Sequence, residues 1–301
     1  MHMNIIANKK WFLLVSVILV AAALISIFTF KFKLGIDFKS GVLWQIRISE
    51  GNEAALRNVL VEKLDVEDPV ITFDGTNDSY SILLPEMSEE TKQSYLTEFQ
   101  KSFNEVESLE YSSISPTVSD ELRQKAIWVV MLVLLIIGGF VAYAFSSVSW
   151  PVSSYKYGAV TLIALAHDTI IAAGFYSLMG HFEGISIDTN FFVALLTIIG
   201  FSVYDTIVVL DRVRENLKKE GSSKIDFAKV VNVSIKETFE RSLNTSITVI
   251  LILVAIWLLG PVSIKYFSLT MLIGMFFGVY SSIFMASPLL VLWHELDTNK
   301  K

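Results

Sequence analysis

The sequence predicts a membrane all-α bundle of six transmembrane helices that carries one α+β domain outside the membrane. Three observations predict this fold class. Apolar residues make up 53% of the 301 residues, against 18% charged residues, and the mean hydropathy is +0.55. The charged residues lie in blocks between long apolar runs, as is typical of membrane proteins. Six of these runs approach or exceed the roughly 20 residues that a helix needs to cross a bilayer core.

Composition also excludes several classes of function. The net charge of -6 argues against a nucleic-acid partner, because phosphate binding requires a basic surface. Cysteine is absent, which excludes disulfides, thiolate metal sites and a cysteine nucleophile. The sequence contains no Gly-rich phosphate loop, and its four histidines lack metal-ligand spacing. We therefore expect no cofactor, no metal and no hydrolytic active site.

The six predicted spans cover residues 11–30, 127–145, 157–179, 187–210, 246–259 and 267–293. The first run could also be a cleaved signal peptide, since Lys9 and Lys10 precede it and three alanines at 21–23 resemble a cleavage site. The apolar run continues to Phe30, however, which favours an uncleaved first span.

The distribution of lysine and arginine predicts the orientation. The connection between the third and fourth spans has no basic residue at 180–186, whereas the connection at 211–243 is rich in them. We therefore expect a cytoplasmic loop at 211–243, and with six spans both termini are cytoplasmic as well. The chain then divides into a first transmembrane helix at 1–30, an extracytoplasmic domain at 31–125 and a five-helix transmembrane region at 126–301.

The segment 31–125 has the pattern of a folded domain. Alternating apolar and polar residues at 42–48 predict a half-buried strand, followed by a helix at 52–64. Further predicted elements are strands at 70–73 and 80–84 around a turn at 74–78, a helix at 88–103 and a strand at 109–114. This β-α-β-β-α-β order suggests a ferredoxin-like fold. The alternative is an irregular α+β domain.

Asp205 is the most informative polar residue inside a predicted span. It lies about six residues before the boundary, roughly 9 Å inside the membrane, which is too deep for its short side chain to reach water. A buried charge there costs about 2.5–3.5 kcal/mol even on the most lenient scale. Arg241 precedes the fifth span and could reach Asp205 from the cytoplasmic end. Such a pair could load and release a proton; alternatively, Asp205 only fixes helix packing.

Other polar residues carry weaker signals. His167 and Asp168 lie near the middle of the third span, but adjacent residues on a helix point about 100° apart and cannot both face one partner. One of them then holds a bundle contact, and an intramembrane enzyme using both is a remote alternative. Asp211 and Arg212 lie at the boundary, where charges reach water. Small residues recur at every fourth position of the sixth span and predict close helix packing: Gly274, Gly278, Ser282 and Ala286.

Five segments resemble motifs of the SecF family of protein-export membrane proteins. Residues 194–216, ALLTIIGFSVYDTIVVLDRVREN, resemble the fourth-span signature of that family, and 237–246, ETFERSLNTS, its approach to the fifth span. Residues 35–38, 115–118 and 166–168 are similar to further motifs, so the resemblance covers nearly the whole chain. Two positions depart from the family pattern: Ser40 and its neighbours replace a Gly-Gly pair, and Tyr204 stands where asparagine is usual.

The resemblance implies a member of the resistance-nodulation-division superfamily in the bacterial cytoplasmic (inner) membrane. Such a subunit works with SecD beside the SecYEG channel and uses the proton motive force in late steps of export of an unfolded preprotein. The resemblance also implies a proton relay through Asp205 and Arg241. Five further residues match the family, and for these we predict an accessory or gating role instead of a part in the relay: His167, Asp168, Thr206, Asp211 and Arg212.

Two other functions remain open. The chain could be a half-transporter of the same superfamily that exports small molecules or lipids, in which case it would have to assemble with a second half. It could also be a structural scaffold in the lipid membrane in which Asp205 has only a packing role.

Overall fold

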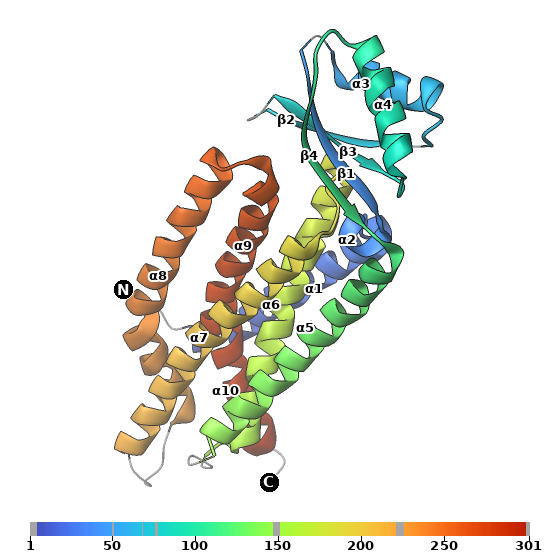
Figure 1. Cartoon of the computed structure of the whole chain (residues 1–301). Coiled ribbons are helices and arrows are strands. Elements are labelled where there is room, and N and C mark those ends of the chain that lie inside the picture. The colour runs from blue at the N-terminus through green and yellow to red at the C-terminus, as the bar shows by residue number, and fades with distance from the viewer. Residues whose placement is uncertain are drawn as a thin grey trace.

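The computed structural model describes residues 5–49, 51–67, 69–75, 78–146, 151–220 and 226–298. Within these ranges, six helices are long and apolar enough to cross a membrane, in agreement with the six predicted spans. Figure 1 shows them as a bundle of long helices with a small α+β domain at one end. The first five are α1 (Lys9–Phe30), α5 (Pro116–Ala144), α6 (Ser154–Glu183), α7 (Thr189–Glu220) and α8 (Phe227–Leu259).

The last spanning helix is interrupted. It consists of α9 (Val262–Ser281), a π-helical turn named η3 (Ser282–Ala286) and α10 (Ser287–Thr298). Pro288, the second residue of α10, has no backbone N–H to donate, so a regular α-helical bond is missing at this point. The widened turn accommodates the proline, and the Ser287 hydroxyl donates to the Ser282 carbonyl across it at 3.3 Å.

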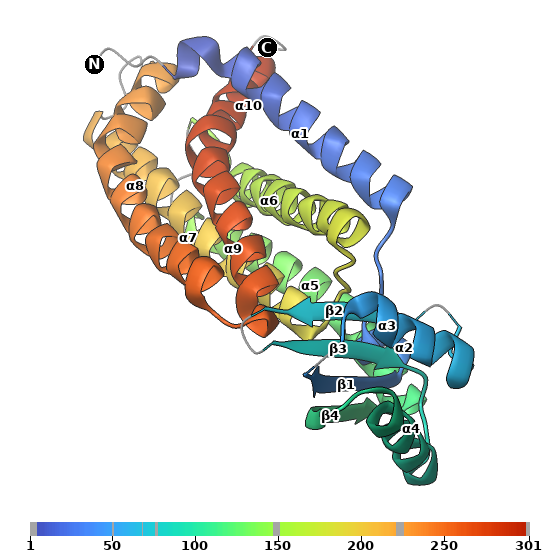
Figure 2. The same cartoon turned by 90° about the horizontal axis from the view of Figure 1, so that it is seen from above.

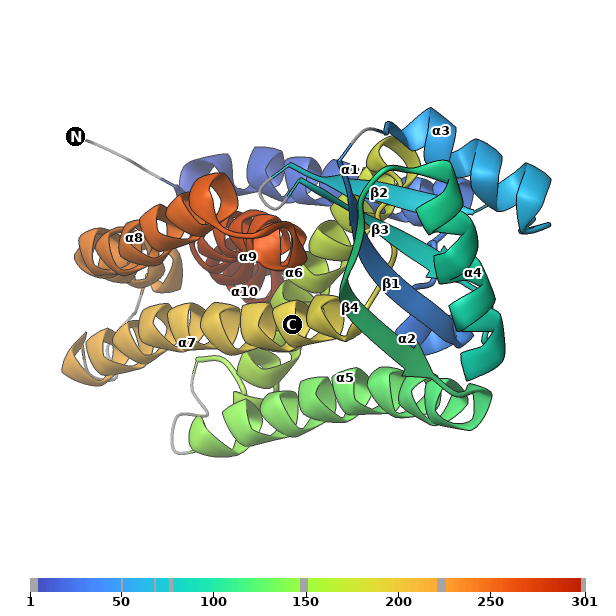
Figure 3. The ribbon, with the colours of Figure 1, turned by 45° about the horizontal axis from the view of Figure 1, so that its top comes forward.

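The α+β domain is formed by the segment of the chain between α1 and α5. Its elements are α2 (Ile36–Lys39), β1 (Gly41–Ile48), α3 (Glu53–Asn58) with the π turn η2 (Val59–Lys63), β2 (Val70–Asp74), β3 (Ser79–Leu84), α4 (Glu89–Ser102) and β4 (Val106–Ile114). The four strands form an antiparallel sheet in the order β2-β3-β1-β4. Figure 3 shows α3 and α4 on the side of the sheet that faces away from the bundle.

The core of the domain follows from the alternation in β1. Val42, Trp44 and Ile46 point to one face and are fully buried, together with Leu56 before η2 and Phe99 on α4. The intervening β1 residues are only partly buried. The N-cap residues Asn52 and Ser88 each accept a backbone N–H at the start of α3 and α4, which fixes where these helices begin.

The end of the bundle far from the sheet holds both ends of the described chain, and we call it the distal end (Figure 2). The backbone N–H of Ile5 donates to Asn232 Oδ1 on α8 at 3.0 Å, and Lys9 forms an ion pair with Glu295 on α10. The short helix η1 (Ile6–Asn8) and the start of α1 are therefore attached to α8 and α10.

The first and third spanning helices approach each other at Gly174. A Cβ atom on this residue would lie 2.6 Å from Ala23 Cα and 2.8 Å from the Ala23 carbonyl oxygen. Backbone atoms cannot move aside as a flexible side chain can, so the substitution would push α1 away from α6. The hydroxyls of Ser26 and Ser177 form hydrogen bonds across the same contact.

We expect Gly174→Ala to destabilise the bundle by about 1–3 kcal/mol, because the added methyl group overpacks the contact between α1 and α6. Thermal unfolding of the purified protein in detergent measures this loss. Gly200→Ala is the matched control, since nothing lies within 4 Å of a Cβ at that position on α7. Equal melting temperatures for the two variants would show that the close contact does not limit stability.

Candidate functional site

Asp205 lies on α7 with its carboxyl group directed into the bundle, and the residue is 8% exposed. The hydroxyl of Ser282, the first residue of η3, donates to Asp205 Oδ2. The hydroxyl of Ser242 on α8 approaches the same carboxyl group without forming a hydrogen bond of good geometry. Two neighbouring helices therefore direct hydroxyl groups at Asp205 on α7, and no described cation forms an ion pair with it.

Asp168 on α6 is more deeply buried, at 1% exposure. His167 Nδ1 lies 2.8 Å from Asp168 Oδ1, and the hydroxyls of Ser202 on α7 and Ser281 on α9 donate to Asp168 Oδ2 at 2.5 and 2.7 Å. His167 and Asp168 therefore contact each other, and Asp168 additionally joins three helices. His167 Nε2 is buried and has no hydrogen-bond partner among the described residues, which is a costly arrangement for a ring nitrogen.

The two acids belong to neighbouring networks. Ser202 and Asp205 are one helical turn apart on α7, and Ser281 and Ser282 are consecutive at the junction of α9 and η3. Both α7 and the last spanning helix therefore take part in the hydrogen bonding of both acids. Gly278 lies beside both groups, since a Cβ there would be in ordinary van der Waals contact with Ser202 Cβ at 3.4 Å and with Asp168 Oδ2 at 3.7 Å. The small-residue stripe of the sixth span therefore lies against α7 beside the buried acids.

A cavity of about 20 Å³ lies beside Asp205. This volume suffices for one water molecule, which needs about 10–15 Å³ and two to four polar partners. Ser202, Asp205, Thr245 and Ser246 are among the lining residues and offer such partners. Tyr204, another lining residue, is 51% exposed on the outside of the bundle. The cavity thus lies between the buried carboxyl group and the outer face formed by α7 and α8.

Arg241 lies near Asp205 in the fold but does not pair with it. Its Nη2 donates to the hydroxyl of Tyr204 at 3.2 Å, and the side chain is exposed. Tyr204 and Asp205 point about 100° apart because they are adjacent on one helix. The arginine therefore contacts the outward-facing neighbour of the residue that the sequence suggested as its partner.

The remaining candidates lie around this centre and toward the distal end. Thr206 is fully buried, and its hydroxyl has no partner among the described residues. Asp211 forms an ion pair with Arg214 on the same helix. Arg212 Nε donates to Glu237 Oε2 on α8 at 2.7 Å, which ties α7 to α8.

Sequence reasoning did not identify Ser202 and Ser281 as partners of a buried acid, and it considered Ser282 only as a small packing residue. The available signal was a set of serines inside apolar spans, since such hydroxyls form hydrogen bonds between helices. Among the described residues, no group of three or more histidine and acidic side chains could hold a metal ion. Hydroxyls, two carboxyl groups and space for water are suited to the transfer of protons.

Comparison with known proteins identifies the family. Residues 94–296 match the family "Protein export membrane protein SecD/SecF, C-terminal", and residues 25–49 match the SecD/SecF GG motif. The SecF subunit of Thermobaculum terrenum is 38% identical, and the alignment covers 98% of this chain and 95% of that protein. For SecF of Anaerolinea thermophila the identity is 33%, with 97% and 94% coverage.

Fused relatives align over part of their length. SecDF of Bacillus subtilis is 31% identical over 98% of this chain and 38% of that protein. A crystal structure of SecDF from Thermus thermophilus, described as a translocon-associated membrane protein, superposes with a TM-score of 0.84 and 30% identity, covering 97% of this chain and 39% of that one. This chain thus spans about two fifths of the SecDF chains and nearly all of the SecF chains. The chain belongs to the SecF family of SecD/SecF protein-export membrane proteins.

Proposed function

We propose that this protein is a SecF-like accessory subunit of the Sec protein translocase that uses the proton motive force to drive late steps of polypeptide export. Its place would be the bacterial cytoplasmic (inner) membrane, with the distal end and both termini in the cytoplasm and the α+β domain outside. The observation that carries the proposal is the buried carboxyl group of Asp205, held by hydroxyls beside a water-sized cavity.

The relay would operate by changing the charge of Asp205. Burial disfavours the charged carboxylate, whereas a nearby guanidinium favours it. Arg241 is already hydrogen-bonded to Tyr204, the neighbouring residue, so a modest movement of its long side chain would bring it toward Asp205. In this proposal a proton reaches Asp205 through water in the cavity and leaves as Arg241 approaches.

The second part of the proposal is mechanical coupling to the outer domain. Asp37 on α2 accepts hydrogen bonds from the backbone N–H and the hydroxyl of Thr189, both at 2.6 Å, at the first residue of α7. Gly35 and Ile187 form a backbone hydrogen bond at 2.8 Å beside it. We call this contact the α2–α7 clasp. Because α7 is continuous, it connects the clasp to Asp205, roughly 24 Å along the helix axis.

Gly35 lies in the segment that matches the SecD/SecF GG motif. A Cβ at this position would lie 2.8 Å from the carbonyl oxygen of Ile187, so only glycine fits without displacing the backbone. In this proposal Gly35 permits the backbone contact of the clasp. The ferredoxin-like assignment of the outer domain belongs to the same proposal and is supported by the β-α-β-β-α-β order and by the strand order β2-β3-β1-β4.

The proposed partners are SecD, the SecYEG channel and an unfolded preprotein. Relatives in which SecD and SecF form one chain support the first of these. We expect SecD and SecYEG to co-purify with the tagged protein from its native membranes in mild detergent. Recovery of a second transporter half without SecD or SecYEG would instead support the small-molecule or lipid half-transporter.

A further inference from the structure

We propose that the distal end contains a binding site for the phosphate of an anionic phospholipid headgroup. The site is a cavity of about 480 Å³ between the start of α1 and the first turns of α8. Its volume lies within the range of about 300–1,000 Å³ that is usual for small-ligand pockets. Its residues are separate from the buried acids, so the inference does not depend on the relay.

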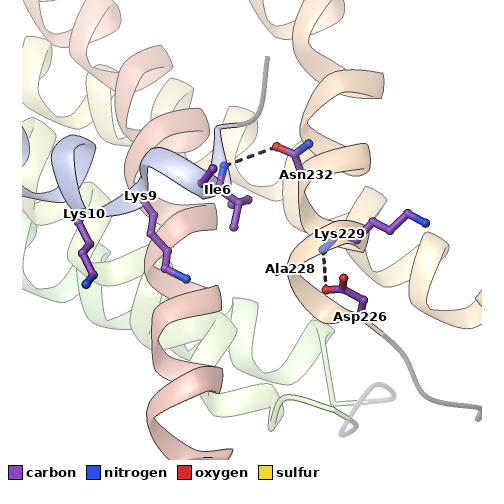
Figure 4. Close-up of a pocket in the computed structure, with 8 residues that line it drawn as sticks. Ile6, Lys9, Lys10, Asp226, Ala228, Lys229 and Asn232 are labelled. Atoms are coloured by element: carbon purple, nitrogen blue, oxygen red, sulfur yellow. Dashed lines mark hydrogen bonds between the residues drawn. The ribbon is translucent and has the colours of Figure 1, made fainter. Parts of the chain in front are cut away.

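The lining of the cavity is basic. Lys9 and Lys10 extend from the start of α1, while Lys229 stands on the α8 side together with Asp226 and Asn232, with its long side chain directed away from the two α1 lysines (Figure 4). Among the described lining residues, Asp226 is the only acid, and its Oδ1 already accepts the backbone N–H of Lys229 at 3.1 Å. The lysines therefore outnumber the acid, which favours an anionic occupant.

Two of these lysines are available to a ligand. Lys9 is paired with Glu295, but Lys10 and Lys229 form no ion pair with any described residue. An ammonium group on a flexible stem can follow the phosphate of a bound headgroup. The two sides of the cavity are joined at one point, because Asn232 Oδ1 accepts the backbone N–H groups of Ile5 and Ile6 and thereby attaches the N-terminal segment to α8.

The position of the cavity identifies the source of the phosphate as lipid. Lys10 directly precedes the apolar run of α1, and Trp11, the first residue of that run, is 70% exposed. Tryptophan at the end of a span is typical of the headgroup region of the bilayer. Basic pockets between transmembrane helices at this depth bind anionic headgroups. The acyl chains of such a lipid would continue along the exposed apolar side of α1.

The test is lipid binding by the full chain in nanodiscs of phosphatidylcholine with or without phosphatidylglycerol, with native mass spectrometry to count retained lipids. We expect retention of phosphatidylglycerol over phosphatidylcholine. The double variant Lys10→Gln with Lys229→Gln should weaken that retention about 25-fold, since each lysine near an anionic headgroup contributes roughly fivefold. Lys229→Gln alone leaves the charges before the first span intact and should weaken phosphatidylglycerol retention about fivefold.

The matched control is the double variant Lys218→Gln with Lys236→Gln. Both lysines are exposed, unpaired among the described residues, and outside the cavity. Equal loss of phosphatidylglycerol from both double variants would overturn the proposal in favour of general surface charge. Competition by millimolar inorganic phosphate in detergent would overturn the assignment to lipid.

Discussion

Replacing Asp205 with asparagine should abolish the stimulation of export by a proton gradient while leaving the protein inserted and folded. Asparagine has nearly the same shape and can still accept the hydrogen bond from Ser282, but its amide cannot gain or lose a proton in the working range. The measurement is preprotein export by vesicles that contain the chain with SecD and SecYEG, with and without an imposed gradient. Export by the variant should fall to the level without a gradient.

The control for Asp205→Asn is Asp65→Asn. This residue is exposed in the α+β domain and has a backbone φ of 52°, a conformation that asparagine adopts readily. The chemical change is the same, but the position lies outside the proposed relay, so normal stimulation is expected. If Asp205→Asn also kept full gradient-dependent stimulation, Asp205 would be a packing residue and the proton relay would be rejected.

Breaking the α2–α7 clasp should uncouple the outer domain from the buried acid. We expect Asp37→Ala to reduce gradient-stimulated export at least tenfold, because two hydrogen bonds to Thr189 are lost and movement of α7 no longer reaches the domain. The helix itself should survive, because the Asp188 side chain also caps α7 by accepting the Phe191 N–H at 2.9 Å.

The matched control for Asp37→Ala is Asp188→Ala, which removes this local cap but keeps the clasp. It should lower stability by about 1 kcal/mol in thermal unfolding and leave coupling intact. Similar export by the two variants would show that capping of α7, and not its attachment to α2, is what matters. In that case the yield of cross-links between the α+β domain and the SecYEG channel would also be the same with and without Asp37→Ala.

Hydropathy predicted the six spans correctly because burial in lipid dominates their composition, but it could not predict where the helices end. The fourth predicted span stops at residue 210, whereas α7 continues to Glu220; the fifth begins at 246, whereas α8 begins at Phe227. These extensions are held by contacts between two helices, such as Arg212 with Glu237. Polar contacts of this kind leave no apolar signature in a single segment.

For the candidate site, the sequence pointed to the buried acid but not to its hydrogen-bond partners. The depth of Asp205 marked it from the sequence alone, since a carboxyl group so far from the boundary needs an explanation. The connection of Asp168 to Ser202 and Ser281 could not be predicted, because it depends on which faces of α6, α7 and α9 meet. For the same reason the sequence could not show that Arg241 contacts Tyr204 and not Asp205.

The π turn η3 has a consequence for how the last helix can move. A helix with one extra residue in a turn can shift that residue along the chain without losing its overall hydrogen bonding. Such a step rotates the residues it passes by about 100° about the helix axis. Ser282, the first residue of η3, would swing away from Asp205 while Ser281, the last residue of α9, stayed on Asp168. We therefore expect a local twist at η3 to change the contacts of Asp205 without changing those of Asp168, with no sliding of whole helices through the bilayer.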